Sequence, residues 1–340
     1  MKTREKPGTA PKPPYLLALA ARERWSRYEI AFWLALIAVY FLFPDNLMLA
    51  TQILITGLFA VSLDLILGYA GIVTLGHAAF FGLGAYTAGL LTTVGYTEPV
   101  LGLLAAGAVA GIFGYLTSYL VLRGRDLSRL MITLGIGLLL HELANEATNL
   151  TGGVDGLQGM VAGRVLGLFN FDLYGKTAYL YVLAVCFLLF AVVRALMTAP
   201  YGLSLRSIRE NPQRAVAIGI PIRARLTNIY TFAAVIAGVS GALLTQTTQF
   251  VALDVFSFER SADLLIILLV GGTATLYGGF VGAAVFLLAQ NWLSTLNAQY
   301  WLFWLGILLI VTTRYMRGGV LGGLKNLLRL ALRRRQGAQA

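Results

Sequence analysis

Apolar residues fill long stretches along most of the chain, and short polar segments separate these stretches. A helix that crosses a bilayer needs about 20 mostly apolar residues, which is longer than most buried strands or helices of soluble proteins. The pattern therefore predicts about ten membrane-spanning helices. Their expected ranges are 29–43, 47–67, 74–94, 99–121, 127–145, 177–197, 226–248, 262–277, 279–296 and 299–316.

The overall composition supports the same class of protein. Hydrophobic residues make up 58% of the 340 residues and charged residues only 12%, about half of the roughly 25% typical of soluble domains. The mean hydropathy is +0.76. So little charge cannot cover a soluble core, and the surplus apolar surface needs lipid as its solvent. We therefore expect an all-α integral membrane protein, and we exclude a soluble enzyme and a disordered chain.

The positive charges indicate how the chain is oriented in the membrane. Of the 26 lysines and arginines, 23 fall on one side of a ten-span topology, and only Arg164, Lys176 and Arg260 fall on the other. Cytoplasmic loops carry such an excess, so both termini are expected in the cytoplasm. The net charge of +11 then reflects topology and attraction to anionic lipid headgroups. It does not indicate a nucleic-acid partner.

Three parts are expected along the chain. Residues 1–28 form a basic cytoplasmic segment without a cleavable signal, residues 29–316 form the membrane domain, and residues 317–340 form a basic cytoplasmic tail. Leucines and arginines at helical spacing over residues 321–335 predict a short amphipathic helix on the membrane surface, with a solvated tail as the alternative.

Motifs for catalysis or cofactor binding are incomplete. His141 and the following glutamate begin a zinc-binding HExxH pattern, but position 145 is Asn. Lys176 follows a glycine as in a phosphate loop, but the earlier glycine of that loop is missing. The single cysteine, Cys186, excludes a disulfide within the chain. We therefore expect a non-catalytic chain with no metal site and no cofactor of its own.

Two glycine-rich stretches are weakly similar to each other. The first begins at Gly68 and reads GYAGIVTLGHAAFFGLGAYTAGLL; the second begins at Gly271 and reads GGTATLYGGFVGAAVFLL. Small residues allow transmembrane helices to pack closely, but paired glycine-interrupted segments also form broken helices that flank a transport path. The second interpretation predicts these translocation-path residues: Asp64, Thr74, Gly76, His77, Phe80, Gly271, Thr275 and Gly279.

Ionisable residues inside the predicted spans are hypotheses for function, because a charge in the bilayer is costly. Asp64 and His77 flank the first glycine-rich stretch, and Asp263 begins the eighth predicted span. Asp64 and His77 lie near the same turn, so a structural alternative is that they satisfy one another or cap that turn. No ladder of acids and bases crosses the membrane, which argues against a proton-coupled carrier. An ion-coupled secondary transporter remains an alternative.

The longest cytoplasmic loop, residues 199–226, reads APYGLSLRSIRENPQRAVAIGIPIRARL. Its apolar residues recur at helical spacing, and arginines fill other positions. Asn211-Pro212 interrupts the pattern, so two short helices are expected. Loops this long in a compact protein are usually functional. We interpret the loop as a docking element for a soluble partner, with an interfacial helix as the alternative.

Three of these segments, in this order, resemble those of a known family: the first glycine-rich stretch, TGGVDGL at residues 151–157, and the loop sequence RSIRENPQRAVAIGI. The chain resembles the branched-chain amino acid (LIV-type) permeases of ABC importers over roughly residues 45–320. The resemblance implies about ten helices in the style of the vitamin-B12 and ribose permeases. Many members have Gln after GYAG, where this chain has Ile72 and Val73.

The resemblance also implies a function and a set of partners. The chain would be a permease subunit that moves branched-chain or other hydrophobic amino acids inward across a bacterial inner membrane. Its partners would be a second related permease, two ATP-binding subunits that hold ATP and Mg²⁺, and an external (periplasmic) substrate-binding protein. Urea and short-amide permeases are similar in these regions and stay an alternative.

The same resemblance assigns residues 206–219 to a coupling helix on the ATP-binding subunit. The implied ATPase-coupling residues are Gly202, Arg206, Arg209, Glu210, Asn211, Arg214 and Gly219. Solute affinity would reside in the external binding protein. This would explain why the expected path lacks a charged pocket for a zwitterion.

Overall fold

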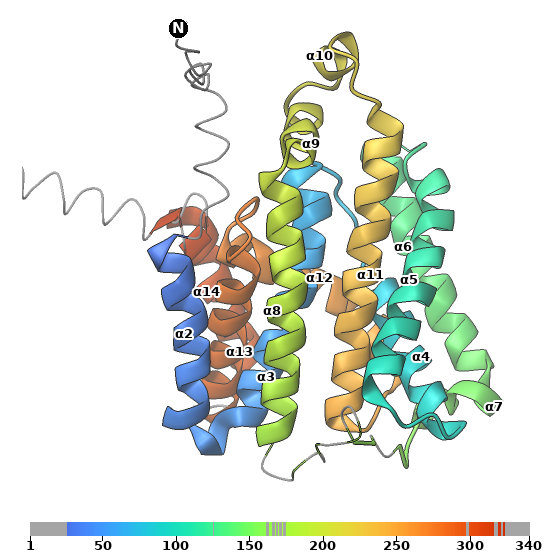
Figure 1. Ribbon diagram of the computed structural model, residues 1–340, viewed down its shortest axis with the longest axis vertical. Coiled ribbons are helices and arrows are strands. Elements are labelled where there is room, and N and C mark those ends of the chain that lie inside the picture. Colours follow the sequence, from blue (N-terminus) through green and yellow to red (C-terminus); the bar gives the residue numbers. More distant parts are fainter. Residues whose placement is uncertain are drawn as a thin grey trace, which may run out of the picture.

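Long helices stand side by side in the computed structural model of the chain, and short helices lie at both ends of the bundle (Figure 1). The structure describes residues 26–124, 126–160, 163–164, 167, 169, 172, 175–296, 299–315, 319–320 and 322–323. Most of the predicted amphipathic helix at 321–335 and most of the terminal segments 1–28 and 317–340 lie outside these residues.

In chain order, the described residues form α-helices, a π-helix (η2) and 3-10 helices (the other η elements). They are α2 (Arg27–Leu42), η1 (Pro44–Asn46), α3 (Leu47–Asp64), η2 (Leu65–Tyr69), α4 (Ala78–Thr93), α5 (Pro99–Val121), α6 (Asp126–Glu146), α7 (Thr148–Thr151), η3 (Gly153–Asp155), α8 (Lys176–Thr198), α9 (Pro200–Glu210), α10 (Pro212–Ala217), α11 (Ile222–Thr248), η4 (Leu253–Phe256), α12 (Phe258–Gly271), α13 (Gly278–Leu296) and α14 (Trp301–Tyr315).

Six helical stretches are long and apolar enough to cross a membrane, so the chain is a multi-pass membrane protein. They are Pro44–Tyr69, Pro99–Val121, Leu127–Glu146, Lys176–Thr198, Ile222–Thr248 and Gly278–Leu296. Each of the other four predicted spans also contains a helix, but α2, α4, α12 and α14 have only 14 to 16 residues. Ten crossings and the vitamin-B12-permease type of fold stay predictions.

Three spans have ends that differ from the prediction by at least four residues. Helix α11 begins at Ile222 rather than at residue 226, and α12 begins at Phe258 rather than at residue 262. Helix α4 begins at Ala78 rather than at residue 74, and α12 ends at Gly271 rather than at residue 277. Both shortened ends fall in the glycine-rich stretches, because glycine stabilises a helix poorly and adopts backbone angles that end one. The apolar pattern continues through these breaks, so hydropathy alone does not reveal them.

Helices α3 and α11 form the centre of the bundle, and α11 packs against α4 and α5. The approach of α4 to α11 is so close that a Cβ atom on Gly84 would collide with the carbonyl oxygen of Gly238. A Cβ atom on Gly241 would likewise collide with the carbonyl oxygen of Phe81. Small residues therefore set the spacing of these two helices, as in other membrane bundles.

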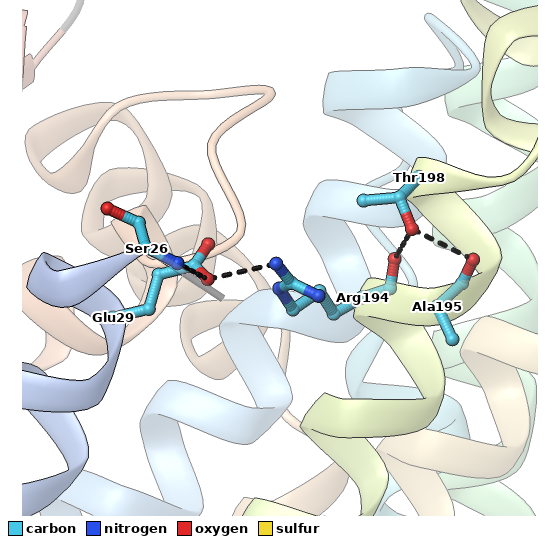
Figure 2. Close-up of polar contacts among 5 residues, drawn as sticks. All are labelled: Ser26, Glu29, Arg194, Ala195 and Thr198. Carbon is cyan, nitrogen blue, oxygen red and sulfur yellow. Dashed lines mark hydrogen bonds and ion pairs between the residues drawn. The ribbon is translucent and has the colours of Figure 1, made fainter. Parts of the chain in front are cut away.

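An ion pair fastens α2 to α8 near the end of the bundle that carries α9 (Figure 2). Arg194 Nη2 lies 3.0 Å from Glu29 Oε2, and the same carboxylate oxygen accepts the Ser26 N–H at 3.0 Å. Arg194 is 6% exposed. Removing one partner of a buried ion pair costs more than the pair itself contributes, because the remaining charge stays buried. Glu29 therefore both caps α2 and neutralises Arg194.

Candidate functional site

The first glycine-rich stretch breaks a long helix near one end of the bundle. Helix α3 continues into the π-helix η2, after which residues 70–77 run without helical structure until α4 begins. The freed backbone groups find side chains on other helices: Leu75 N–H donates to Thr133 Oγ1 at 3.2 Å, and Ala78 N–H donates to Ser261 Oγ at 3.0 Å. Non-helical backbone at membrane depth requires such partners inside the protein.

The second glycine-rich stretch forms the turn between α12 and α13. Gly272 and Ala274 both have positive φ angles, of 109° and 59°. Thr275 Oγ1 donates to the Gly272 carbonyl at 2.6 Å within the turn. Asp64 Oδ1 accepts the Ala274 N–H at 2.7 Å. The carboxylate of Asp64 therefore joins the end of α3 to a turn that lies 210 residues further along the chain.

Asp64 and His77 have different partners. His77 Nε2 and Ser62 Oγ are 2.8 Å apart, and the imidazole stacks on the Phe59 ring with the centroids 5.6 Å apart. The interpretation that Asp64 and His77 satisfy one another is therefore wrong. Asp64 instead caps the turn of the second glycine-rich stretch. Both side chains are almost completely buried, at 0% and 1% exposure.

Helix α9 lies against η2, and its arginines contact that element. Arg209 Nη1 donates to the Gly68 carbonyl, and the Arg206 guanidinium lies 5.0 Å from the centroid of the Tyr69 ring. Both arginines also act electrostatically on the Asp64 carboxylate. Arg206 and Arg209 were expected at a docking surface for a partner, but the structure gives each of them a contact within its own chain. Their ATPase-coupling role stays a prediction.

The start of α9 is fixed by contacts with α8 and α11. Gly202 is buried where a Cβ atom would collide with the Met197 carbonyl oxygen. The Tyr201 hydroxyl donates to the Arg225 carbonyl at 3.0 Å, and the Arg225 guanidinium lies 4.9 Å from the Tyr201 ring centroid. Burial raises the pKa of Tyr201, and the nearby Arg225 charge opposes this. The hydroxyl therefore remains a neutral donor.

The expectation of two short helices in the long loop is confirmed, and the second of them projects from the bundle (Figure 1). Asn211 separates α9 from α10, and its side chain accepts the Arg214 N–H at 3.0 Å as an N-cap. Val216 and Ile218 expose 61% and 72% of their surface at this tip. Gly219 follows with a φ of 82°. Glu210, Arg214 and this apolar pair are exposed, as are Arg206 and Arg209, so this part of the loop is open to a partner.

A cavity of about 530 Å³ lies toward the opposite end of the bundle, between α3, α12 and α13. Its polar wall includes Gln52 on the first half of α3 and Asn291 on the last half of α13. Phe59 and Phe81, whose ring centroids are 4.5 Å apart, form an apolar wall. Four charged residues also line the cavity: Asp254, Glu259, Arg260 and Asp263.

Arg260 is held in this cavity by two contacts. Its Nη2 lies 2.7 Å from Asp254 Oδ2, and its guanidinium lies 5.5 Å from the Phe81 ring centroid. This cavity is therefore a charged pocket, and the expectation that the translocation path lacks one stays a prediction. Of the four charged residues, only Asp263 was predicted from the sequence as a functional candidate. The segment DVFSFERSAD carries a recognisable signal, since three acids and one arginine fall within ten residues beside a predicted span.

The eight predicted path residues do not line this cavity. Thr74, Gly76 and His77 lie in the buried non-helical segment, and Phe80 packs edge-on against Tyr230 with a centroid distance of 5.5 Å. Gly271, Thr275 and Gly279 belong to the α12–α13 turn and the beginning of α13. These positions are consistent with helix packing, and a role in the path stays a prediction.

One helix connects the cavity with α9. Gln52, Thr56 and Phe59 of α3 line the cavity, and Asp64, Gly68 and Tyr69 follow along the same continuous helical stretch. At 1.5 Å per residue, the distance from Gln52 to Tyr69 is roughly 25 Å. Phe59 stacks on His77 and so ties the cavity wall to the first glycine-rich stretch. The cavity wall and the contacts with α9 therefore lie on one continuous helical stretch.

A multi-pass bundle with a solute-sized cavity and a projecting loop is the architecture of a membrane permease. Residues 46–313 match the family described as "Branched-chain amino acid transport system / permease component", and the chain belongs to this family. The predicted LIV-type resemblance is thus confirmed.

Two curated relatives have the same degree of similarity. The chain is 26% identical over 319 residues to the high-affinity branched-chain amino acid transport system permease protein LivM of Salmonella typhimurium and to the protein of that name from Escherichia coli. Each match covers 86% of this chain and 73% of the relative. No solved structure gave a significant match.

Proposed function

We propose that the chain is a permease subunit of a binding-protein-dependent ABC importer that moves branched-chain or other hydrophobic amino acids into the cell. The family and the names of the two relatives support this substrate class. The observation that carries the proposal is the continuous stretch Pro44–Tyr69, which lines the cavity and also contacts α9. The chain is a transport subunit without catalysis, and ATP and Mg²⁺ bind to partner chains.

The proposed assembly follows from the family. It comprises this chain, a second related permease, two ATP-binding subunits and a periplasmic substrate-binding protein, in a bacterial inner membrane. The four shorter helices α2, α4, α12 and α14 complete ten crossings. The arginines around α9, α10 and the start of α11 support a cytoplasmic location of that end of the bundle. The cavity then opens toward the external side.

Coupling would proceed through α10 and α9. The exposed Val216 and Ile218 offer an apolar contact to an ATP-binding subunit. When ATP closes the two partners, α10 and α9 move together, and the contacts of Arg209 with Gly68 and of Arg206 with Tyr69 transmit the motion to α3. A tilt of α3 changes one wall of the cavity. This is a rigid-element mechanism of alternating access.

The apolar cavity wall favours amino acids over the alternative substrate class. Phe59, Phe81, Leu264 and Phe286 can cover an aliphatic side chain, whereas urea has no apolar group to bury and a short amide has only a small one. An ion-coupled secondary transporter would require neither an exposed docking tip nor ATP-binding partners.

The proposal is tested with Val216→Glu/Ile218→Glu in the complete complex, purified in detergent and reconstituted in proteoliposomes. We expect normal membrane insertion but loss of the ATP-binding subunits, because two charges replace the apolar docking pair. Leucine uptake should fall by at least about tenfold, equivalent to roughly 1.4 kcal/mol of docking free energy. Arg206 and Arg209 suit this test less well, since both contact their own chain.

The matched control is Val94→Glu, the same change at a residue that is 73% exposed and lies next to the end of α4, remote from α10. This variant should retain the ATP-binding subunits. Full copurification and full uptake by the double variant would show that the tip does not dock. ATP-independent uptake by the chain alone would replace the proposal with a secondary transporter.

A further inference from the structure

The charges of the cavity between α3, α12 and α13 define the kind of solute group that it can hold. We propose that this cavity binds the ammonium group of an aliphatic amino acid between Glu259 and Asp263, with the side chain of the solute against Phe59 and Phe81. The inference rests on the proposed function and adds a site and its chemistry to it. The volume of about 530 Å³ lies within the range of roughly 300–1,000 Å³ of small-molecule sites.

The cavity carries an excess of negative charge. Three carboxylates and one guanidinium line it, and the guanidinium of Arg260 is already paired with Asp254 at 2.7 Å. Glu259 and Asp263 form no ion pair with Arg260, although its charge also acts on Asp263. They are four residues apart on α12, so they lie on the same face of the helix and repel each other. A cation bound between them removes this repulsion.

The surroundings of the two carboxylates strengthen the preference of the cavity for a cation. Apolar walls lower the local dielectric constant and concentrate the field of the carboxylates in the opening. Glu259 and Asp263 are exposed near the start of α12, so both carboxylates are accessible to a solute. Glu259 and Asp263 therefore attract a primary ammonium group and oppose the entry of an anion.

The rest of an amino acid also finds suitable groups. Gln52, Gln290 and Asn291 line the cavity, and their side-chain amides can donate hydrogen bonds to a carboxylate. Phe59 and Phe81 offer an apolar surface next to Arg260. One cavity thus presents acids for the ammonium group, amides for the carboxylate, and rings for an aliphatic side chain.

The charge preference can be measured by labelling a cysteine in the complete complex. Ser294→Cys places a thiol in the cavity wall, whereas native Cys186 is fully buried. A trimethylammonium methanethiosulfonate should modify it about tenfold faster than the sulfonate analogue, because fields in such clefts change encounter rates by at least that factor. Thr93→Cys is an exposed control outside the cavity. It gives the ratio of the labelling rates of the cationic and anionic reagents in open solvent. Equal ratios at both positions would overturn the proposal.

The role of the two acids is tested by Glu259→Gln/Asp263→Asn. In the Ser294→Cys background this change should abolish the preference for the cationic reagent. Millimolar leucine should slow labelling of the unaltered cavity, whereas 4-methylpentanoate, which lacks the ammonium group, should not. Equal protection by the two compounds would mean that the ammonium group is not recognised.

Transport assays distinguish a failure of this inference from a failure of the proposed function. In proteoliposomes, Glu259→Gln/Asp263→Asn should lower ATP-driven leucine uptake at least about tenfold while the complex still assembles. Glu98→Gln, an exposed acid outside the cavity, should leave uptake unchanged. Unchanged uptake by the double variant overturns the inference and leaves the proposed function standing. Absence of ATP-driven uptake by the unaltered complex overturns the proposed function, and the inference fails with it.

Discussion

The two glycine-rich stretches break helices in similar ways, but they pack against different parts of the bundle. In the first, a Cβ atom would collide with Thr133 of α6 at Gly76, with Phe256 of η4 at Gly82, and with Gly238 of α11 at Gly84. In the second, the close approaches lie mostly between the adjoining helices α12 and α13. Examples are Gly271 against the Gly278 carbonyl and Gly282 against the Ile267 carbonyl.

The first stretch therefore holds several distant elements together, whereas the second closes one helical hairpin and places it against α3. Asp64 joins the two by accepting the Ala274 N–H. Similar sequences thus serve different packing roles, because a glycine only permits a close approach. The partner that makes the approach is determined elsewhere in the chain.

The largest expected effect is that of Gly84→Val in the first stretch. The side chain would collide with the backbone of Gly238, which cannot move without separating α4 from α11. We expect a loss of at least about 3 kcal/mol of stability, the upper range for overpacking, and a lower thermal midpoint in detergent. Gly135→Val on α6 is the control, since no atom lies within 4 Å of a Cβ atom there. Equal stability of the two variants would contradict the packing role of Gly84.

An intermediate effect is expected from Asp64→Leu at the junction of the two stretches. The change leaves the Ala274 N–H without its acceptor, which costs roughly 1–3 kcal/mol for a buried donor. Asp64→Asn retains an oxygen at the same place and should recover most of the loss. Thermal stability and uptake should be measured together. Equal loss in both variants would show that the negative charge near Arg209, rather than the hydrogen bond, matters.

The smallest expected effect is that of Ser261→Ala, which removes the acceptor for the Ala78 N–H at the beginning of α4. We expect a loss of about 1 kcal/mol, seen as a small decrease in the thermal midpoint. Thr247→Ala serves as control, because its hydroxyl bonds only to carbonyls within its own helix. If both substitutions have the same effect, the bond from α12 does not stabilise the break before α4.

The helices were predicted closely wherever the apolar pattern alone decides them. Helix α5 begins and ends as expected, α13 begins one residue early, and α8 is one residue longer at each end. The shortened ends lie at α4 and α12, where glycine-rich sequence ends the helices within an apolar stretch, and α11 and α12 also begin four residues early. The break at Asn211-Pro212 was also predicted, because proline disfavours helical backbone in the residue before it.

The candidate site was less accessible to sequence reasoning. Asp263 was identified as an ionisable residue in a predicted span, but its neighbours in the cavity come from α3, α4, α11 and α13 as well as α12. Arg206 and Arg209 are exposed, as the loop sequence suggests, but their contacts with Tyr69 and Gly68 depend on how α9 folds back. Such contacts join residues about 140 positions apart.

The sequence by itself determined that this protein is a helical membrane protein and where most of its helices lie. The physical reason is that lipid satisfies no backbone hydrogen bond, so a long apolar stretch must bond within itself as a helix. Only the tertiary structure decided which helices meet, that Asp64 caps the turn at Ala274, and that four charged residues share a cavity with Phe59 and Phe81. Lipid and protein interior are almost equally apolar, so the pattern marks a side chain as removed from water without saying which neighbour covers it.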